Sequence, residues 1–305
     1  MYRKKLTVGL IIFLIGTSII PATAQDMDKK PLAPSNGNWL YVGGNGPGNY
    51  TTIQDAINHA SVGTTIFVYD DSSPYHETIT LRLAVNLQGE NKETTIINGG
   101  GNLQVLSVSA SSANISHFTF TNSDIGILGS LNNSVIFDNI FLTDQAGIGL
   151  FKSSDNSISE NVIGPSIYYH EVGIVLTDNC YNNIISRNSV QKCYVGIGLQ
   201  AKCNRNTIRD NIMSNNYYGV NLYYVFLNII EKNNFMNNNK SAYFVISFFN
   251  RWTKNYWDDW SGRGPKAIAG LCTYPWDPWN DTKGIPYLNF DWRPTKEPYN
   301  IPGMS

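Results

Sequence analysis

A spacing of 22 or 23 residues recurs through this 305-residue chain and limits what it can fold into. An apolar residue followed three positions later by Asn returns six times, and successive Asn residues are 22, 27, 23, 22 and 22 positions apart. A second Asn lies two positions before the apolar residue in five units, and a Gly-apolar-x-apolar motif shares the period. Three motifs with one period indicate a repeat architecture. The repeat residues are Asn139, Asn161, Asn188, Asn211, Asn233 and Asn255.

Each unit is too short for two helices and contains short alternating apolar stretches separated by Asn or Gly. This pattern predicts a parallel β-helix with three strands per coil, in which equal positions stack in columns about 4.8 Å apart. Leucine-rich repeats have a similar length, but Leu is sparse here. The traced inward positions predict about nine coils. They are Ile66, Val85, Leu106, Ile127, Ile148, Ile174, Ile197, Val220 and Tyr243.

The repeated Asn residues have two interpretations. Stacked amides can hydrogen-bond from coil to coil in ladders, and Asn tolerates the left-handed backbone of bends between strands. The alternative is a ligand-binding role. Because buried amides without partners are costly, the structural ladder is the favoured interpretation.

The two open ends of a β-helix need covers. Thr52 and Asp55 form a capping box, and Gly63 is the expected helix stop. The segment between them predicts a helix that closes the first coil, because its apolar residues share one helical face. At the other end, residues 258–305 mix Trp, Pro and Asp without a repeat and predict an aromatic cap. The apolar helical residues are Ile53, Ala56, Ile57 and Ala60.

The first 24 residues have the pattern of a secretory signal peptide: a basic start, an apolar run from Leu6 to Ile20, and small residues up to Ala24. An uncleaved anchor is the alternative, although the apolar run is shorter than the ~20 residues of a spanning helix. Residues 25–38 form the expected linker, and 39–257 the β-helix with its N-terminal cap. We therefore expect a secreted or cell-surface protein that contacts a membrane only through an uncleaved signal segment.

The charge balance argues against one class of partner. The chain has 22 Lys and Arg against 23 Asp and Glu, and 37 Asn residues supply much of its polarity. A nucleic-acid partner is not expected, because phosphate binding needs a basic face. Export permits disulfides. Cys180 and Cys203, one repeat apart, either form a bridge or stack as two small apolar side chains.

Two stretches carry a family resemblance. The segment from Tyr50 to Ile57, followed by a β-rich run, resembles the start of pectin-lyase-like, right-handed parallel β-helix proteins. The Asn-x-Ile-x-x-Asn and Gly-Ile-x-Leu repeats are similar to those of carbohydrate-binding and sugar-hydrolase repeat proteins and of the NosD-type periplasmic family. The closing segments 255–260 and 289–292 resemble the tails of secreted β-helix proteins. The resemblance covers about residues 39–292 and implies a single all-β, right-handed parallel β-helix.

The NosD-type resemblance implies copper delivery, which needs clustered soft donors. Neither the His residues nor the mature Met residues show paired ligand spacing, so we predict no metal site and a copper role is not favoured. The clustered Asp of calcium-dependent pectate lyases is not recognisable, so calcium is not indicated and no cofactor is expected. The residues concerned are His59, His76, His117, His170, Met27, Met213, Met236 and Met304.

The residue before each repeat Asn forms a column of charged side chains. Asp138 and Glu160 are expected one coil apart, about 4.8 Å, and Glu160 and Asp210 two coils apart, about 9.6 Å. These separations approach those of retaining and inverting carboxylate pairs, and Arg187 lies between them. We predict these four residues as catalytic candidates. The alternative is a solvated face of mixed charges, and the motifs of polygalacturonase-like hydrolases are absent.

The unit between Asn161 and Asn188 is longer than its neighbours and predicts a protruding loop, where function often resides. Tyr194 and Tyr217 occupy the equivalent bends of the next coils. Sugar rings stack on aromatic side chains through their apolar faces. We predict a carbohydrate-binding strip, against the alternative that the tyrosines only pack over bends. It comprises Tyr168, Tyr169, His170, Glu171, Tyr194 and Tyr217.

These expectations describe an exported β-helix protein whose partner is an extracellular polysaccharide or a cell-envelope glycan. One alternative is a polysaccharide lyase or glycoside hydrolase that uses the charged column. Another is a structural component of the cell envelope. Product assays and binding measurements on a glycan panel separate the three.

Overall fold

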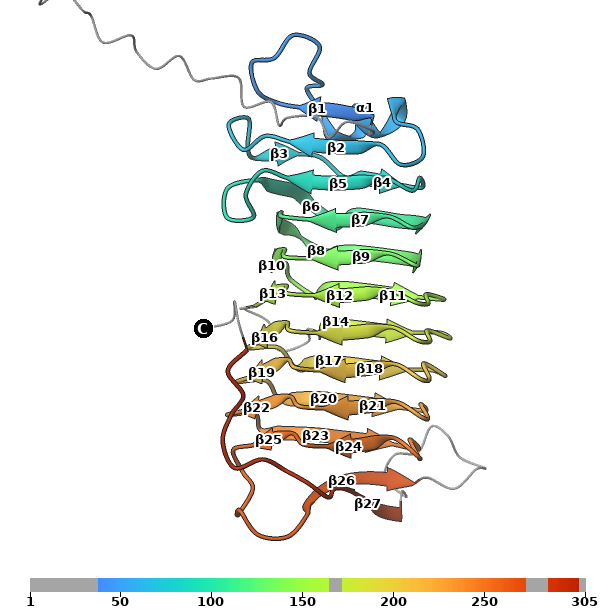
Figure 1. Cartoon of the computed structure of the whole chain (residues 1–305), viewed down its shortest axis with the longest axis vertical. Coiled ribbons are helices and arrows are strands. Elements are labelled where there is room, and N and C mark those ends of the chain that lie inside the picture. Colours follow the sequence, from blue (N-terminus) through green and yellow to red (C-terminus); the bar gives the residue numbers. More distant parts are fainter. Residues whose placement is uncertain (1–37, 165–171, 273–284, 302–305) are drawn as a thin grey trace, which may run out of the picture. The chain divides into compact units, whose positions relative to one another are not determined.

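The computed structural model describes residues 38–164, 172–272 and 285–301. Their strands pair in parallel from one coil to the next and build three faces (Figure 1). This confirms the expected fold class, an all-β right-handed parallel β-helix with three strands per coil. The predicted signal peptide and nearly all of the predicted linker lie outside the described residues.

Face A stacks ten described strands, so the coils number one more than expected. The additional coil begins at β1, where Leu40 pairs with Ile66, and none of the sequence motifs marks it. The strands of face A are β1 (Trp39–Val42), β2 (Thr65–Val68), β5 (Asn86–Gly89), β7 (Asn114–Ser116), β9 (Val135–Phe137), β12 (Ser157–Ser159), β15 (Ile184–Ser186), β18 (Thr207–Arg209), β21 (Ile229–Glu231) and β24 (Arg251–Thr253).

Faces B and C share two long strands that turn from one face into the other, β6 (Ile96–Ser111) and β8 (Thr119–Asn132). The other strands of face B are β3 (Tyr75–His76), β10 (Ile140–Leu142), β13 (Val162–Ile163), β16 (Ser189–Gln191), β19 (Ile212–Ser214), β22 (Asn234–Met236) and β25 (Tyr256–Trp257). Those of face C are β4 (Ile79–Leu81), β11 (Ala146–Phe151), β14 (Val172–Thr177), β17 (Val195–Gln200), β20 (Tyr218–Tyr223), β23 (Lys240–Val245) and β26 (Lys266–Cys272).

The core is a set of apolar columns, and the predicted column is correct in its middle. Leu106 and the four residues Ile127, Ile148, Ile174 and Ile197 pair in register and are fully buried. Each buried residue is therefore covered by its counterparts in the neighbouring coils, which removes its apolar surface from water.

The predicted column is wrong at both ends. Ile66 pairs with Leu87 on face A, and Val85 lies just before β5. At the other end, Ala242 is the partner of Val220, while Tyr243 pairs with the outward-facing Asn221. A one-residue error in register exchanges the inner and outer faces, because strand side chains alternate.

Two ladders of Asn side chains run beside these columns. Asn188 donates its Nδ2 and its backbone N–H to Asn211 Oδ1, at 3.0 and 2.9 Å, and Nδ2 also donates to the Ile158 carbonyl of the preceding coil. Because each amide is satisfied in this way, the ladder interpretation is confirmed. The ladders comprise Asn139, Asn161, Asn188, Asn211, Asn233 and Asn255, and Asn156, Asn183, Asn206, Asn228 and Asn250.

The left-handed backbone belongs to the residues before the ladder Asn residues, not to the ladder residues themselves. Asp138, Glu160 and Arg187 have φ of 52°, 59° and 53°. A bend at this position turns the next side chain inward, where its amide meets the amide of the neighbouring coil. The ladder bonds offset the cost of a left-handed non-Gly residue, roughly 1–2 kcal/mol.

Cys180 and Cys203 are buried free thiols one coil apart. The Cys180 backbone N–H donates to Cys203 Sγ at 3.2 Å. Ser153 and Ser247 occupy the same place relative to their own ladder Asn, and their hydroxyls accept a backbone N–H from the preceding coil. Of the two interpretations of the cysteines, the structure supports stacked side chains. The Cys203 thiol accepts a backbone N–H from the preceding coil, as the Ser hydroxyls do elsewhere in the column.

The helix α1 (Ile53–His59) covers the first coil at the β1 end (Figure 1). Its N-cap is confirmed, since the Thr52 side chain accepts the Asp55 N–H at 3.2 Å. The expected stop is wrong. Ala60 is already extended and forms the C-cap, so Gly63 lies beyond the helix.

The last coil is covered by β26 and the antiparallel strand β27 (Ile285–Asp291). The first Asn ladder ends here on the buried carboxylate of Asp291. Trp257 stacks on Phe235 within the last coils, with centroids 4.2 Å apart, whereas Trp292 is 72% exposed. The extent of the aromatic cap over 258–305 stays a prediction.

Candidate functional site

The four predicted catalytic residues occupy one corner of successive coils, each with a left-handed backbone. Glu160 Oε1 accepts from Arg187 Nε at 2.8 Å and Nη2 at 2.6 Å. Asp138 contacts Lys92 at 2.5 Å, and Asp210 contacts the neighbouring Arg209 at 2.6 Å. Each carboxylate therefore has a basic partner, as on a solvated face of mixed charge. A catalytic role for this column stays a prediction.

The tyrosines of the predicted strip lie partly in the described residues. Tyr168, Tyr169, His170 and Glu171 fall outside them, so their contribution stays a prediction. Tyr194 and Tyr217 are described, and they lie one coil apart at the corner that leads into face C.

Tyr194 and Tyr217 form a parallel stack on the surface. Their ring centroids are 4.9 Å apart, the ring planes differ by 9°, and the side chains are 39% and 37% exposed. Tyr218 packs edge-on against both rings, at 5.6 and 4.7 Å. Tyr243 extends the cluster by one coil, 5.5 Å from Tyr218. We call these four residues the tyrosine cluster.

A short amide ladder holds the backbone of these corners. Asn216 Oδ1 accepts the Cys193 N–H at 2.9 Å, and Asn216 Nδ2 donates to Asn238 Oδ1 at 3.1 Å. The corner is also bonded directly, since the Tyr218 N–H donates to the Tyr194 carbonyl at 2.8 Å. A rigid corner fixes the rings before any ligand arrives, which lowers the entropy cost of binding.

Lys240 adds a positive charge to the cluster. Its Nζ lies 5.5 Å from the centroid of Tyr218 and 5.0 Å from that of Tyr243, within the range of cation–π attraction. Burial, and then the neighbouring phenols Tyr194 and Tyr217, raise the pKa of Tyr218 to about 12. At neutral pH Tyr218 therefore keeps its proton, and the cluster presents aromatic rings and hydroxyls beside Lys240.

Sequence reasoning missed part of this cluster. Tyr218 and Lys240 pair directly across the coils, and Tyr243 was taken to face inward. The doublet Tyr217–Tyr218 and the 22-residue step from Tyr218 to Lys240 were the available signals. Both depend on the exact register, which the unit lengths leave ambiguous by one residue.

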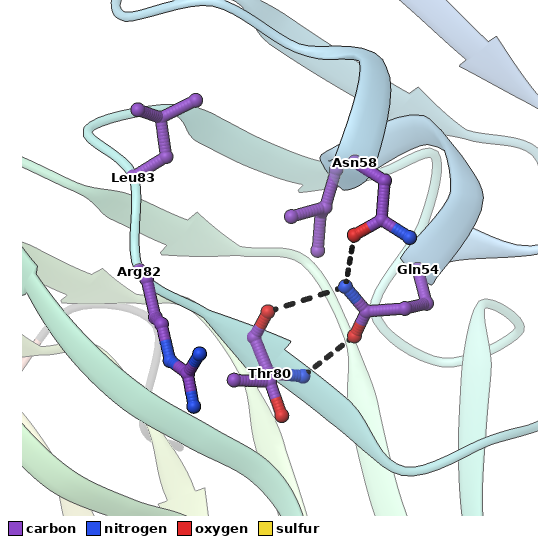
Figure 2. Close-up of a pocket in the computed structure, with 6 residues that line it drawn as sticks. Gln54, Asn58, Thr80, Arg82 and Leu83 are labelled. Atoms are coloured by element: carbon purple, nitrogen blue, oxygen red, sulfur yellow. Dashed lines mark hydrogen bonds between the residues drawn. The ribbon is translucent and has the colours of Figure 1, made fainter.

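A second candidate is a cavity of about 550 Å³ between α1 and β4, which Figure 2 shows. Gln54 bridges its two walls. Its Oε1 accepts the Thr80 N–H at 2.7 Å, and its Nε2 donates to the Thr80 carbonyl at 3.3 Å and to Asn58 Oδ1 at 3.0 Å. The side chain thereby supplies β4 with the hydrogen bonds of a missing strand neighbour. This arrangement is an end cap rather than a free set of ligand-binding groups.

The described residues do not fit a copper site. No group of three His, Cys, Asp or Glu side chains within them is arranged to hold a metal ion. Cys180, Cys203 and Met213 are fully buried in the core, and His117 contacts Asp138 at 3.5 Å. Cys180 and Cys203 contact each other, but no third His, Cys, Asp or Glu of the described residues completes a metal site with them.

A family model described as "Periplasmic copper-binding protein (NosD)" matches residues 57–262. No curated protein sequence matches the chain. Within the part of the chain that the structure describes, no helix has the length and hydropathy needed to cross a membrane.

Solved structures with a similar fold share little sequence with the chain. A polygalacturonase from Erwinia carotovora ssp. carotovora is 12% identical, with 75% of this chain and 80% of that one covered and a TM-score of 0.48. ORF18 of Geobacillus virus E2 is 12% identical, covering 73% and 58%, with a TM-score of 0.45. The A-module of an Azotobacter vinelandii mannuronan C-5 epimerase is 15% identical, covering 73% and 83%, with a TM-score of 0.38.

Proposed function

The chain belongs to the NosD family of β-helix proteins, described as periplasmic and copper-binding, and we propose that this member is exported and binds polysaccharide at the tyrosine cluster. The proposed partner is an extracellular polysaccharide or a cell-envelope glycan. A copper role is not part of the proposal, because no group of three His, Cys, Asp or Glu side chains in the described residues is arranged to hold a metal ion.

The exposed stack of Tyr194 on Tyr217 carries the proposal. The two parallel rings on adjacent coils cover each other on one face, and the partly exposed stack presents an amphipathic platform of ring edges, remaining ring face and phenolic hydroxyls. Sugar rings have an apolar C–H face and a polar edge, so they complement such amphipathic surfaces. Lys240 lies beside the platform and supplies a hydrogen-bond donor for hydroxyl or carboxylate groups.

Alanine substitution of the stacked tyrosines tests the proposal. We expect Tyr194→Ala and Tyr217→Ala together to weaken binding at least about tenfold, since an aromatic contact contributes about 0.5–1.5 kcal/mol. An array first ranks oligosaccharides of cellulose, chitin, pectin and alginate by their binding to the unaltered chain. Calorimetry then measures the affinity of each variant for these oligosaccharides. Unchanged affinity in the double variant would end the hypothesis.

Tyr181→Ala provides a matched control. Tyr181 is 50% exposed at a different corner of the coil and does not belong to the tyrosine cluster. Its removal deletes a comparable exposed ring and is expected to leave the affinity of disaccharides for the tyrosine cluster unchanged. Urea unfolding of all variants checks that the fold is retained. Equal losses at Tyr181 and at the cluster would indicate non-specific aromatic adhesion.

A further inference from the structure

A hollow of about 550 Å³ lies at the other end of face C from the tyrosine cluster. It occupies the corner where β14, β17 and β20 end, strands that pair side by side (Figure 1). Its main lining side chains are Asp178, Asn179, Lys202, Tyr223, Tyr224 and Phe226.

A change in corner length accounts for the hollow. After β17, Ala201 and Lys202 both have left-handed backbones, with φ of 49° and 66°. Of the first two residues after β20, only Tyr224 has a left-handed backbone, with φ of 57°. The N–H groups of Ala201 and Lys202 donate to the carbonyls of Tyr223 and Tyr224, at 3.0 and 2.9 Å. The longer corner thus stands over the shorter one and leaves space beside its rings.

The lining has the mixed chemistry of a sugar site. Tyr223 and Tyr224 pack edge-to-face with centroids 4.5 Å apart, which gives an aromatic wall. Asp178 accepts from Asn179 Nδ2 at 2.7 Å and lies 3.5 Å from Lys152 Nζ, so the opposite wall is polar. Apolar walls with a few placed polar groups are typical of small-molecule sites, and 550 Å³ lies within their usual size range.

The hollow and the tyrosine cluster lie at opposite ends of the same strands. β20 begins at Tyr218 in the cluster and ends at Tyr223 in the hollow, a span of about 17 Å at the usual rise per residue. Between them, Gly198 of β17 pairs with Asn221 of β20. Gly198 has no side chain, so β17 leaves a gap in the outer surface of face C between the side chains of Val175 and Asn221.

We infer that the hollow is a second sugar subsite, and that one polysaccharide chain crosses face C parallel to the strands, from the tyrosine cluster to the hollow. The inference rests on the proposed function. Affinity should then depend on the length of the oligosaccharide. Once a long oligosaccharide is bound at the tyrosine cluster, its contact with the hollow is intramolecular, and this second contact raises the affinity.

A length series with two kinds of variant tests this inference. Disaccharides, tetrasaccharides and hexasaccharides of galacturonate, cellulose and chitin are titrated calorimetrically into the full chain. Tyr224→Asn removes the ring from the hollow and suits the left-handed backbone. Gly198→Phe places a ring on the strip between the subsites, where a Cβ meets its nearest atoms at 3.6 Å or more. Both are expected to weaken hexasaccharide binding at least about tenfold and to leave disaccharide binding at the tyrosine cluster unchanged.

Gly149→Phe is the matched control. Gly149 holds the same position on face C two coils earlier, through the pairs Gly149–Val175 and Val175–Gly198, away from both subsites. Hexasaccharide affinity that survives both Tyr224→Asn and Gly198→Phe, in folded variants, would overturn the second subsite and leave the proposed function standing. Failure of the unaltered protein to bind any of these oligosaccharides would overturn both.

Discussion

Asn255 donates its backbone N–H and its side-chain Nδ2 to one oxygen of Asp291, Oδ2, at 2.9 and 3.0 Å. The same oxygen accepts from Trp257 Nε1 at 3.1 Å, and Oδ1 accepts the backbone N–H of Lys254 and of Arg293. In the first ladder, each Asn amide donates to the Asn oxygen of the next coil. The last Asn therefore needs an acceptor group that has no donor of its own to be satisfied. A carboxylate group, whose oxygens only accept, meets that need.

Loss of the Asp291 carboxylate is expected to destabilise the fold strongly. Asp291→Ala leaves the donors of Asn255 and Trp257 buried without an acceptor, and we expect a loss of roughly 3–5 kcal/mol in the free energy of unfolding. Asp291→Asn keeps one acceptor oxygen and is expected to cost about half as much. Urea unfolding measures both. Equal stability of Asp291→Ala and the unaltered chain would contradict the capping role.

A mid-ladder amide is expected to matter more than a surface one. Asn211→Ala removes the acceptor of both Asn188 donors and is expected to cost roughly 2–4 kcal/mol. Asn114→Ala is the control, because that side chain is exposed and donates to the side chain of Asn86 on the surface. We expect a change below about 0.5 kcal/mol there. Thermal or urea unfolding that ranks the two variants equally would refute the ladder as a source of stability.

The thiol of Cys203 is expected to act as a hydrogen-bond acceptor. Cys203→Ser keeps an acceptor for the Cys180 N–H, as Ser153 and Ser247 do in their coils, and should cost less than about 1.5 kcal/mol. Cys203→Ala loses the acceptor and leaves a void, so we expect a larger cost, about 2–3 kcal/mol. The hydrogen bond with Cys180 and burial raise the pKa of the Cys203 thiol. Alkylation of Cys203 at pH 8, followed by mass spectrometry of its own peptide because Cys272 is less buried, should therefore be slow until urea unfolds the chain; rapid alkylation of Cys203 in the native protein would argue against this packing.

Alkaline pH is expected to weaken the fold through Tyr218. Its folded-state pKa of about 12 exceeds the ordinary value of 10.0, so the unfolded chain releases the proton first. The stabilisation is complete below about pH 10 and is lost as pH rises through about 12. Tyr218→Phe should flatten this part of the stability curve, measured by urea unfolding across the pH range. An unaltered slope in the variant would show that Tyr218 is not the group responsible.

A substitution in the charged column distinguishes a catalytic role from a purely structural role at the surface. Glu160→Gln is expected to change stability by less than about 1 kcal/mol, because its ion pair with Arg187 is solvent-accessible. If the column is only a solvated face, reducing-end and unsaturated-product assays on the glycan panel should give no turnover with either form. Turnover that Glu160→Gln abolishes would instead assign this protein to the lyases or hydrolases.

The repeat made the middle of the fold predictable, because Asn188, Asn211 and Asn233 recur with apolar partners at fixed offsets. The ends were harder. Tyr243 was misplaced because its coil has Ser241 where earlier coils have Gly, which removes the landmark for the register. Asp291 carries no repeat signal at all, since it reaches the ladder from a strand 36 residues further along the chain.

The candidate site was only partly accessible from the sequence for a related reason. Tyr194 and Tyr217 were found because each lies two residues before a repeat Gly. The hollow depends on one extra residue in the corner at Lys202, compared with the corner at Tyr224. Periodicity cannot reveal such a feature, because it is a departure from the period.

The directional amide ladder makes the coil an interchangeable module. Each coil offers the same amide oxygen to the preceding coil, and that oxygen accepts the same two donors, as Asn211 Oδ1 does from Asn188. Within this ladder, duplicating or deleting a whole coil between Asn188 and Asn233 would leave no amide donor or acceptor unmatched, whereas a partial insertion would interrupt the series. β-Helices of different length can thus arise by copying one coil. A single carboxylate at the C-terminal end of the ladder suffices for any number of coils.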